Sequence, residues 1–540
     1  MKKFLSTITC VTLLIGLSAC SNDNNVRQET TTIQNVQFSF TNEEFGQDEE
    51  LTRTAGKHNT QTIEIGDCEA EISVESEPAY RSTRGTRAQA TGHYTIRAYQ
   101  SGAKKGEMSG TFSGGTFTPD ATSPKEMGLA PGTYEFVAFN DDVIPLGNHL
   151  TISRNKAETS MIGTTTVSIT ATPRKQQVNF TMKHVGVRLR TQFICKKDIP
   201  NNITATLEAT AANVIPATVA YNPLTNAYTA TKGAMSPVSN NSSASTEAKY
   251  AASNYGQNYS YTSTGSYHYF LPTTEGSKLK LTNISLGTVF WKPIATFSIP
   301  QLNATLSMQQ GKSYVVKIKL KPSFTYLMSD GNTGAFKETT FGGGSKTPIG
   351  IVLDPIKQIA VGLQRKDEQW CANWSPQRST NPASNFTDLI AREDGYEETW
   401  NPSTSVGGLV KATNPILKAF NVAGEYSNGL SVSGTMTGKK WYLPAMGEFK
   451  LIVSTLGFGD VSTIPAWGET PWYGHLAALA FSQVGESNAI SFSHYYWTST
   501  EFSFGGQHGN AGQLWVKQDA IQWRLWSKVS NEGILSFVKY

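Results

Sequence analysis

The side chains that could perform chemistry are spread thinly along this chain. It contains no HExxH zinc motif, no GxSxG nucleophile turn and no dinucleotide-binding GxGxxG. The Gly-Lys-Ser of "MQQGKSYV" lacks the first glycine of a phosphate-binding loop, because Leu306 stands five positions before Gly311. We therefore expect no catalytic residue, no cofactor and a chain that is not an enzyme.

The histidines and cysteines give no metal-binding pattern. His184 falls in a strand-like run, where we expect it to be packed or at the rim of a sheet. The last region contains His475, His494 and His508, but no short or i,i+4 spacing joins them, so we expect no metal. Three widely spaced cysteines follow the N-terminal segment, and we expect buried free thiols, although one pair could bridge: Cys68, Cys195 and Cys371.

Composition excludes some classes of protein. Lys and Arg number 46 against 42 Asp and Glu, so the chain has no large basic excess for a nucleic-acid partner. Only 16% of residues are charged, while Gly, Thr, Ser and Asn are abundant, which suits extracellular β-proteins better than cytosolic enzymes.

Residues 1–20 have the pattern of an export signal. "MKK" supplies the positive charge, "FLSTITCVTLLIGL" is an apolar run too short to span a bilayer, and "LSAC" ends at Cys20. "LSAC" resembles the lipobox of bacterial lipoproteins, which implies lipidation at Cys20 and an outer-membrane anchor during export. The alternative is an ordinary cleaved signal peptide with an incidental cysteine.

Short strands separated by turn residues dominate the chain up to about residue 322. "NVQFSF" alternates Val36, Phe38 and Phe40 on one face, and "GTYEFVAFN" and "SYVVKIKLKP" have similar alternation. This pattern is typical of β-sandwiches. Beyond residue 323 the composition changes, because ten of the eleven tryptophans lie there, and helical spacing appears at 385–393, 414–426, 447–457 and 475–485.

We therefore predict a mainly β protein in which two Greek-key-type β-sandwich domains in tandem precede an α+β domain. The predicted boundaries are a signal peptide at 1–20, a tether with the first strand and an Arg-bearing leader at 21–88, sandwiches at 89–172 and 173–322, a linker at 323–347 and the last domain at 348–540.

The run "QQVNFTMKHVGVRLR", preceded by "GTYEFVAFND" and "LTISRNKAETSMIGTTTVSI", resembles the fimbrillin family. Its members are the subunits of type V pili of Bacteroidales, including Mfa-like surface lipoproteins, and the likeness covers about residues 33–321.

The resemblance implies assembly by strand exchange. An arginine-specific protease removes a first strand, and a strand of the next subunit fills the groove. Here the leaving strand would be "NVQFSF", with Val36, Phe38 and Phe40. The candidate cleavage sites are Arg53, Arg81, Arg84 and Arg87.

"KKWYLPAMGEF", followed by "YYWTSTEF" and "GQLWVKQ", resembles C-type-lectin-like domains of the formylglycine-generating and major-paralogue type. The likeness covers about residues 348–540 and marks a fold, not an activity. It implies structural roles in the core and at a helix start for Trp441, Leu443, Pro444, Glu448, Tyr496, Trp497, Ser499 and Glu501.

Two loop-like aromatic stretches, "WGETPWYGH" and "EFSFGGQHGNAGQ", are the predicted ligand surface. The residues concerned are Trp467, Trp472, Tyr473, Phe502 and Phe504.

The leading hypothesis is a non-enzymatic adhesin at the cell surface, a tip or accessory subunit of a type V pilus. Its partners would be other pilus subunits, joined by strand exchange, and a host or bacterial glycan or protein. The alternative is an anchored outer-membrane lipoprotein that binds glycans without polymerising. A formylglycine-generating-type enzyme ranks last, since Cys371 is the single cysteine of that region.

Overall fold

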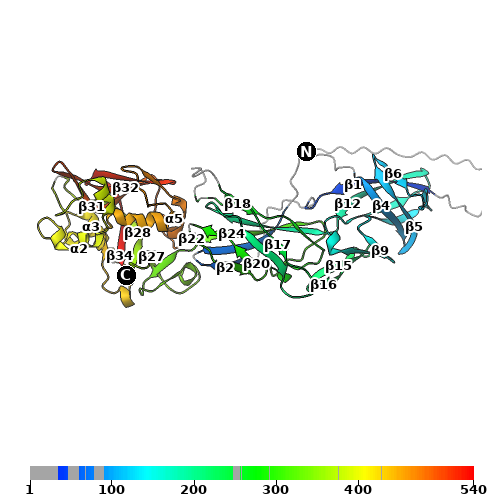
Figure 1. Cartoon of the computed structure of the whole chain (residues 1–540), viewed down its shortest axis with the longest axis horizontal. Helices are drawn as coiled ribbons and strands as arrows, with labels where there is room; N and C mark the ends of the chain where they lie inside the picture. The colour runs from blue at the N-terminus through cyan, green and yellow to red at the C-terminus, as the bar shows by residue number, and fades with distance from the viewer. Residues whose placement is uncertain are drawn as a thin grey trace, which may run out of the picture. The chain divides into compact units, whose positions relative to one another are not determined.

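The computed structural model describes residues 34–46, 60–66, 68–77, 90–246, 256, 258–290, 292–374, 376–426 and 429–540. These residues form a mainly β structure with several sheets and five short α-helices (Figure 1). The chain divides into two compact units. Unit 1 takes residues up to 41, 89–139 and 163–181, and unit 2 takes 42–88, 140–162 and 182–540.

Unit 1 is built on an eight-stranded sheet in the order β6-β5-β4-β8-β11-β12-β1-β7. The sheet curls over, so that β7 lies beside β5. A Cβ added at Gly106 of β5 would lie 3.1 Å from Met127 Cγ of β7. The strands are β1 (Gln34–Glu43), β4 (Gly92–Gln100), β5 (Ala103–Ser113), β6 (Thr116–Pro119), β7 (Met127–Leu129), β8 (Gly132–Asn140), β11 (Met161–Ile169) and β12 (Lys175–His184).

Unit 2 begins with three sheets of four to six strands and a two-stranded ribbon. One sheet has the order β18-β13-β24-β3-β2, with β19 also paired to β13; its strands are β2 (Gln61–Ile65), β3 (Cys68–Ser76), β13 (Val187–Cys195), β18 (Tyr261–Thr264), β19 (His268–Phe270) and β24 (Ser313–Pro322). A second, β16-β15-β10-β9, comprises β9 (Ile144–Leu146), β10 (His149–Ser153), β15 (Ile215–Asn222) and β16 (Ala227–Gly233). The third, β17-β14-β20-β23, comprises β14 (Thr204–Ala209), β17 (Val238–Ser239), β20 (Leu279–Ser285) and β23 (Phe297–Ile299), and the ribbon pairs β21 (Thr288–Val289) with β22 (Lys292–Pro293).

The C-terminal part of unit 2 is a ten-stranded sheet with helices. Its strands are β25 (Thr325–Met328), β26 (Thr333–Ala335), β27 (Pro348–Asp354), β28 (Ile359–Gln369), β29 (Trp441–Tyr442), β30 (Glu469–Pro471), β31 (His494–Phe504), β32 (Gln507–Val516), β33 (Ala520–Ser527) and β34 (Asn531–Lys539). The last strand, β34, lies inside the sheet between β28 and β31 and also pairs with β29.

The helices are α1 (Phe386–Ala391), α2 (Gly395–Trp400), α3 (Lys418–Gly424), α4 (Phe449–Thr455) and α5 (Gly474–Ser482). Three of them (α1, α3 and α4) fall within the predicted helical ranges, α5 begins one residue before its predicted range, and α2 was not predicted. None of the helices in the described part of the chain is both long and apolar enough to cross a membrane.

The predicted domain boundaries differ from the observed units. The predicted boundary between the two sandwiches is at residue 172. Strand β12 lies after this boundary but belongs to the sheet of unit 1, whereas β9 and β10 lie before it but pair within unit 2. The predicted leader also contains β2 and β3, which are part of a unit 2 sheet. The predicted linker at 323–347 is wrong, because β25 and β26 lie in the C-terminal sheet and Tyr326 is fully buried there.

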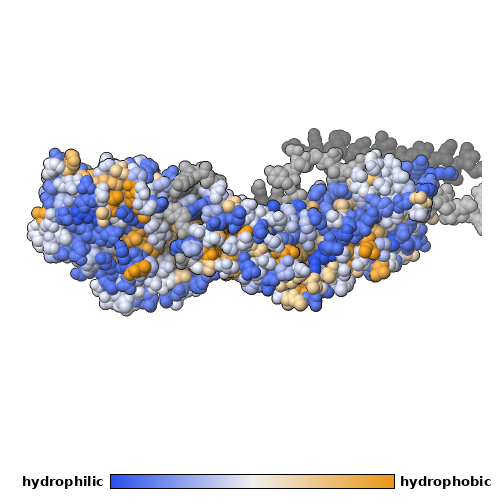
Figure 2. All heavy atoms as spheres, viewed as in Figure 1, coloured by the Kyte–Doolittle hydropathy of each residue, from blue (hydrophilic) through white to orange (hydrophobic). Residues whose placement is uncertain are grey.

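Strand β9 is an exposed edge of unit 2. Ile144 and Leu146 are both largely exposed, and Figure 2 shows an apolar patch where Figure 1 labels β9. Pro145 between them has no N–H to donate, which limits the pairing of a further strand at this edge.

Candidate functional site

Strand β1 supplies a large part of the aromatic core of unit 1. Val36, Phe38 and Phe40 alternate along it, and all three are buried, as their spacing predicts. The Phe40 ring stacks on Tyr94 at 4.6 Å between centroids and on Phe180 at 5.2 Å. The side chains of β1 are therefore embedded in apolar contacts with four other strands; further ring contacts join Phe40 to Phe112 and Phe117, and Phe38 to Phe117 and Phe180.

The backbone of β1 runs parallel to β12. Asn35 N donates to Arg174 O at 2.9 Å, Ser39 Oγ donates to Asn179 Oδ1, and Thr41 Oγ1 donates to Phe180 O at 3.3 Å. These partners are 139, 140 and 139 residues apart, and a constant offset means that the two strands share a direction.

The other edge of β1 is only partly covered. Antiparallel partners on β7 reach Gln34, Asn35 and Val36 and extend no further along β1. A cavity of about 300 Å³ lies beside β1, and its walls combine Phe38, Met108 and Phe117 with the charged residues Lys125, Glu126 and Lys175. The buried face of β1 therefore lies in an apolar groove, and the space beside the strand is lined by polar as well as apolar side chains.

The predicted processing residues lie outside the described part of the chain. Cys20, Arg53, Arg81, Arg84 and Arg87 are all among the residues about which the structure says nothing.

The eight residues of the lectin-like motif lie in the interior of the C-terminal region. Trp441, Leu443, Pro444, Glu448, Tyr496, Trp497, Ser499 and Glu501 are all buried. Two hydrogen bonds join the two halves of the motif: Ser499 N donates to Pro444 O at 2.8 Å, and Met446 N donates to Thr500 Oγ1 at 3.0 Å.

Glu448 ends the 3₁₀ turn Met446–Glu448 that leads into α4. Its carboxylate accepts hydrogen bonds from Ala445 N at 2.7 Å and from the Tyr442 hydroxyl at 3.0 Å. Burial raises the pKa of Glu448 to about 7, against the lowering effect of these two bonds. The carboxyl thus caps the turn and is held by two neighbouring donors.

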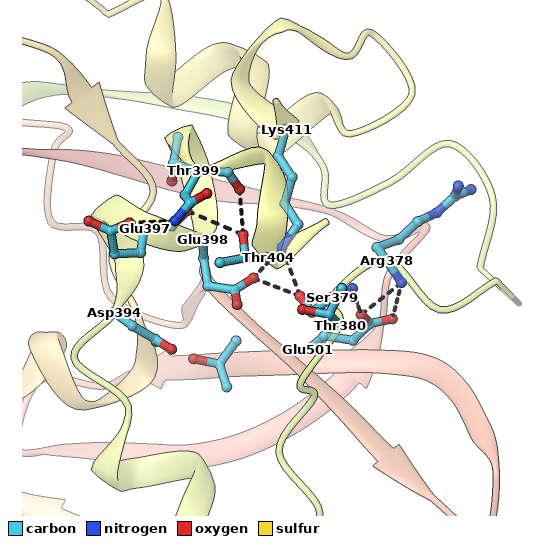
Figure 3. A network of polar contacts seen from close by, with 12 residues as sticks. Arg378, Ser379, Thr380, Asp394, Glu397, Glu398, Thr399, Thr404, Lys411 and Glu501 are labelled. Atoms are coloured by element: carbon cyan, nitrogen blue, oxygen red, sulfur yellow. Dashed lines mark hydrogen bonds and ion pairs between the residues drawn. The ribbon is translucent and has the colours of Figure 1, made fainter. Parts of the chain in front are cut away.

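A buried polar network holds the loop around Ser379 against β31 (Figure 3). The Glu501 carboxylate accepts hydrogen bonds from the backbone N–H groups of Arg378 and Ser379 and forms an ion pair with Lys528. Nearby, Lys411 pairs with Glu398 and donates to Ser379 Oγ at 2.9 Å, while Ser379 Oγ donates to Glu398 at 2.7 Å.

The Ser379–Lys411 contact has the composition of a nucleophile and its base, but its surroundings do not suit catalysis. Ser379 is 1% exposed and Lys411 is fully buried, so a substrate has no route to the hydroxyl. Burial raises the pKa of Glu398 and lowers the pKa of Lys411, while their mutual attraction acts in the opposite sense. The network therefore has a structural role, which is to hold the loop around Ser379 against β31.

Three of the five predicted ligand residues are placed inside the protein, so their prediction as an exposed surface is wrong. Trp472 is fully buried and donates from Nε1 to Lys517 O at 2.9 Å. Tyr473 is buried beside Lys197, whose Nζ lies 5.0 Å from its ring centroid. Phe502 is buried in the main apolar core. Their Gly- and Pro-punctuated sequence indicates turns, but it does not show which way the aromatic rings point.

The other two predicted ligand residues are exposed. Phe504 is 77% exposed at the end of the β31–β32 hairpin. Trp467 is 42% exposed, although its ring also packs edge-on against Phe386 at 4.8 Å. Two further tryptophans, Trp374 and Trp526, are exposed and were not among the predicted ligand residues. The signal for Trp526 was present in "IQWRLWS", where Trp523 and Trp526 are three residues apart and must lie on opposite faces of a strand.

Cys68, Cys195 and Cys371 are all buried, and Cys195 and Cys371 are free thiols, as expected. Burial raises the pKa of Cys195 to about 12, so this thiol stays protonated. Within the described residues, no three His, Cys, Asp or Glu side chains come together as a metal site.

No known protein family and no curated protein matches this sequence. Solved structures that share some similarity include a candidate cell adhesion protein from Bacteroides ovatus, with 13% identity, 53% of this chain and 92% of that one covered, and a TM-score of 0.31. A fimbrial protein from the same species has 11% identity, covers 95% and 100% of the two chains and has a TM-score of 0.28. A fimbrial assembly protein from Parabacteroides distasonis has 9% identity, covers 45% and 91%, and has a TM-score of 0.24. TM-scores this low carry no argument for the function of this chain.

Proposed function

We propose that this chain is a non-enzymatic adhesin at the cell surface, a fimbrillin-type tip or accessory subunit of a type V pilus. Unit 1 would join a neighbouring subunit by strand exchange, and the C-terminal, lectin-like region would bind a ligand. The observation that supports this most strongly is β1, an apolar strand of unit 1 whose chain continues directly into unit 2.

The contacts of β1 are of a kind that another strand can reproduce. They are mainly backbone hydrogen bonds to β12 and apolar packing at alternate positions, to which the Asn35 amide and the Ser39 and Thr41 hydroxyls add side-chain bonds. The backbone bonds and the apolar packing do not depend on one particular side chain, so a strand with apolar residues two apart could occupy the same groove.

Strand order favours Arg53 among the four candidate cleavage sites. A cut after Arg53 would leave β1 attached to unit 1 by non-covalent contacts alone. A cut after Arg81, Arg84 or Arg87 would also detach β2 and β3. Strand β3 pairs with β24 at nine successive positions and buries Cys68, Ala70 and Ile72, so its removal would expose the core of unit 2.

The C-terminal region supports the ligand-binding half of the proposal through its layout. Strand β34 pairs with β28, so the first long strand and the last strand of this region are neighbours. This arrangement holds the long intervening segment between them, which comprises α1–α5, β29–β33 and the loops that join them, and such loops suit the display of a binding surface. The ligand would be a host or bacterial glycan or protein.

The N-terminus of the protein in sheared surface filaments tests the proposal by mass spectrometry. We expect a start directly after Arg53, and we expect Arg53→Ala to block both processing and incorporation. The triple variant Arg81→Ala, Arg84→Ala, Arg87→Ala is the matched control and should be processed normally.

The alternative function predicts a different result. A protein that keeps a lipidated Cys20 and an intact β1, and that is found in the outer membrane but never in filaments, would be an anchored glycan receptor. That result would overturn the pilus assignment.

A peptide of sequence QNVQFSFTNE gives a second test. After full-length protein is cut with an arginine-specific protease, the fluorescently labelled peptide should exchange into unit 1. The same peptide with Ser in place of the Val and of both Phe residues should not bind, since it lacks the apolar face.

A further inference from the structure

A cavity of about 480 Å³ opens into unit 2, away from the C-terminal sheet. Its walls come from β10 and the 3₁₀ turn Arg154–Lys156 that follows it, from β15, from residues 235–238 and from β19. Asn155 and Ser236 of the wall are exposed, so solvent reaches the cavity. A pocket of this volume is large enough for a small organic molecule.

Apolar side chains form much of the wall. Phe270 is buried, Ala217 and Met235 are half-buried, and Val238 is 36% exposed. Apolar atoms that face an unfilled space lose the van der Waals contacts that a neighbour would give them. A ligand with an apolar body would supply these contacts.

Arg154 brings a positive charge to the cavity. Its Nη1 donates to Pro216 O at 3.2 Å, and its Nη2 donates to Ala234 O. A guanidinium has five N–H donors, so three donors of Arg154 have no acceptor in the described part of the chain. Both acceptors are uncharged carbonyls. Burial lowers the pKa of Arg154, and no carboxylate among the described residues acts against this effect.

The lysines that lie close to the wall in sequence already have acidic partners. Lys156 pairs with Asp142 at 2.7 Å, and Lys232 pairs with Glu275 at 3.9 Å. These pairs leave neither an acid to neutralise Arg154 nor a second free cation beside it.

The titratable wall residues His268 and Tyr269 add no charge at pH 7. Burial lowers the pKa of His268, so its ring is neutral. Burial raises the pKa of Tyr269, and Glu158 raises it further while Arg188 lowers it. The opposite charges of Glu158 and Arg188 offset one another, so the described wall keeps a single positive charge on Arg154.

We propose that this cavity binds a small organic carboxylate with an apolar body. The carboxylate would accept hydrogen bonds from the free N–H groups of Arg154, because a guanidinium fork matches the two oxygens of a carboxylate. The apolar body would fill the space beside Met235, Val238 and Phe270. A single cation in apolar surroundings matches a monoanion. This inference goes beyond the proposed function, since unit 2 would bind the carboxylate whether or not the chain assembles into pili.

Isothermal titration calorimetry of the full-length protein with indole-3-acetate, 4-phenylbutyrate and decanoate at pH 7 tests the site. We expect at least one of these acids to bind, and its neutral amide to bind about tenfold or more weakly, since the amide cannot form charge-assisted bonds.

Variants of the wall separate the role of charge from that of volume. Arg154→Gln should bring the acid down to the affinity of its amide, and Arg154→Lys, which keeps the charge but not the fork, should weaken binding less. Ala217→Leu keeps Arg154 but fills part of the cavity, and should weaken the acid and the amide alike. Lys232→Gln is the matched control, because it removes an exposed cation of β16 that lies outside the cavity, and should bind as the unchanged protein does.

Three results would overturn the inference. If none of the acids binds at millimolar concentration, the cavity is not a carboxylate site. If acid and amide bind equally, or if Lys232→Gln weakens binding as much as Arg154→Gln does, Arg154 does not recognise the ligand. If N-acetylneuraminate binds through Arg154 while the three acids do not, the ligand is an acidic sugar and not a carboxylate with an apolar body. Thermal melting of each variant shows whether unit 2 keeps its fold, and Ala217→Leu still tests the cavity if the Arg154 variants do not fold.

Discussion

The groove of β1 in unit 1 and the Glu501 network in the C-terminal region hold their segments in opposite ways. Strand β1 is fixed mainly by apolar rings and backbone bonds, with side-chain bonds from Ser39 and Thr41 and a cavity beside it. The Ser379 loop is fixed by buried ion pairs and hydrogen bonds to Glu501 and Glu398, each with a defined direction.

The difference determines which segment can be exchanged. Apolar contacts are not directional, so a groove built from them accepts different strands of suitable pattern. Buried charges require particular partners at particular positions, because an unpaired buried charge is very costly. Unit 1 therefore suits the exchange of a strand, whereas the C-terminal region suits a loop that stays bound permanently.

Removal of one charge from the network should have the largest effect. Lys528→Met leaves the fully buried Glu501 carboxylate without its cation, and we expect a loss of about 4–5 kcal/mol in the stability of the C-terminal region. Calorimetry should show this transition shifted while the melting of unit 1 stays in place.

The double variant Lys528→Met, Glu501→Gln removes both charges and should recover part of the loss. Equal losses in the single and the double variant would mean that packing, and not charge, holds the Ser379 loop.

Truncation in the groove should cost somewhat less. Phe40→Ala removes a fully buried ring that stacks on Tyr94 and Phe180, and we expect unit 1 to lose about 3–4 kcal/mol. Phe40→Leu should reduce the stability of unit 1 far less, because Leu keeps most of the apolar volume that fills the groove. Chemical denaturation followed by tyrosine fluorescence measures both, and similar costs for the two variants would contradict an exchangeable groove.

The sequence predicts apolar alternation well and buried polar partners poorly. Val36, Phe38 and Phe40 were predicted as one buried face because a strand alternates its sides, and they are buried. Four helices were predicted from their periodicity, whereas α2, which is as short as α1, carries only two apolar residues, Tyr396 and Trp400, and was missed.

The Glu501–Lys528 and Glu398–Lys411 pairs bring together residues 27 and 13 positions apart, and no spacing rule relates them. The direction in which an aromatic ring points from a loop is equally hard to predict from sequence. Trp472 and Tyr473 were predicted as a ligand surface, but the direction of a side chain in a turn depends on tertiary packing, here against Lys517 and Lys197.

The pH dependence of stability should further distinguish the C-terminal region from unit 1. Burial raises the folded-state pKa of Glu448 from 4.5 to about 7, so the folded protein binds a proton that the unfolded chain has already released in this range. The contribution of Glu448 is therefore fully present below about pH 4.5 and is lost as the pH rises through 7.

Comparison with Glu448→Gln isolates this dependence, because Gln does not titrate. We expect the stability difference between the two proteins to change by about 3 kcal/mol from pH 4.5 to pH 7.5, measured by denaturation at each pH. A flat difference would mean that Glu448 titrates normally in the folded protein.

The smallest effect should come from the surface ion pairs of β3. Glu71 pairs with Lys319 and Lys321, which lower its pKa against the effect of burial. Glu71→Gln should cost less than about 1 kcal/mol, because partly exposed pairs contribute little. A larger loss of unit 2 stability would show that β3, like the Ser379 loop, is held by charge and not by its buried face.

The long sequence separation of paired strands has a consequence for synthesis of the chain. Glu71 of β3 meets Lys321 of β24, which is 250 residues further along. At about 5–20 residues per second, the ribosome makes that partner roughly 12–50 seconds after β3 has emerged. Strand β1 likewise waits for β12. Because β2 and β7 are available earlier as partners of β3 and β1, it is one edge of each early strand that stays unpaired while the rest of the chain is made.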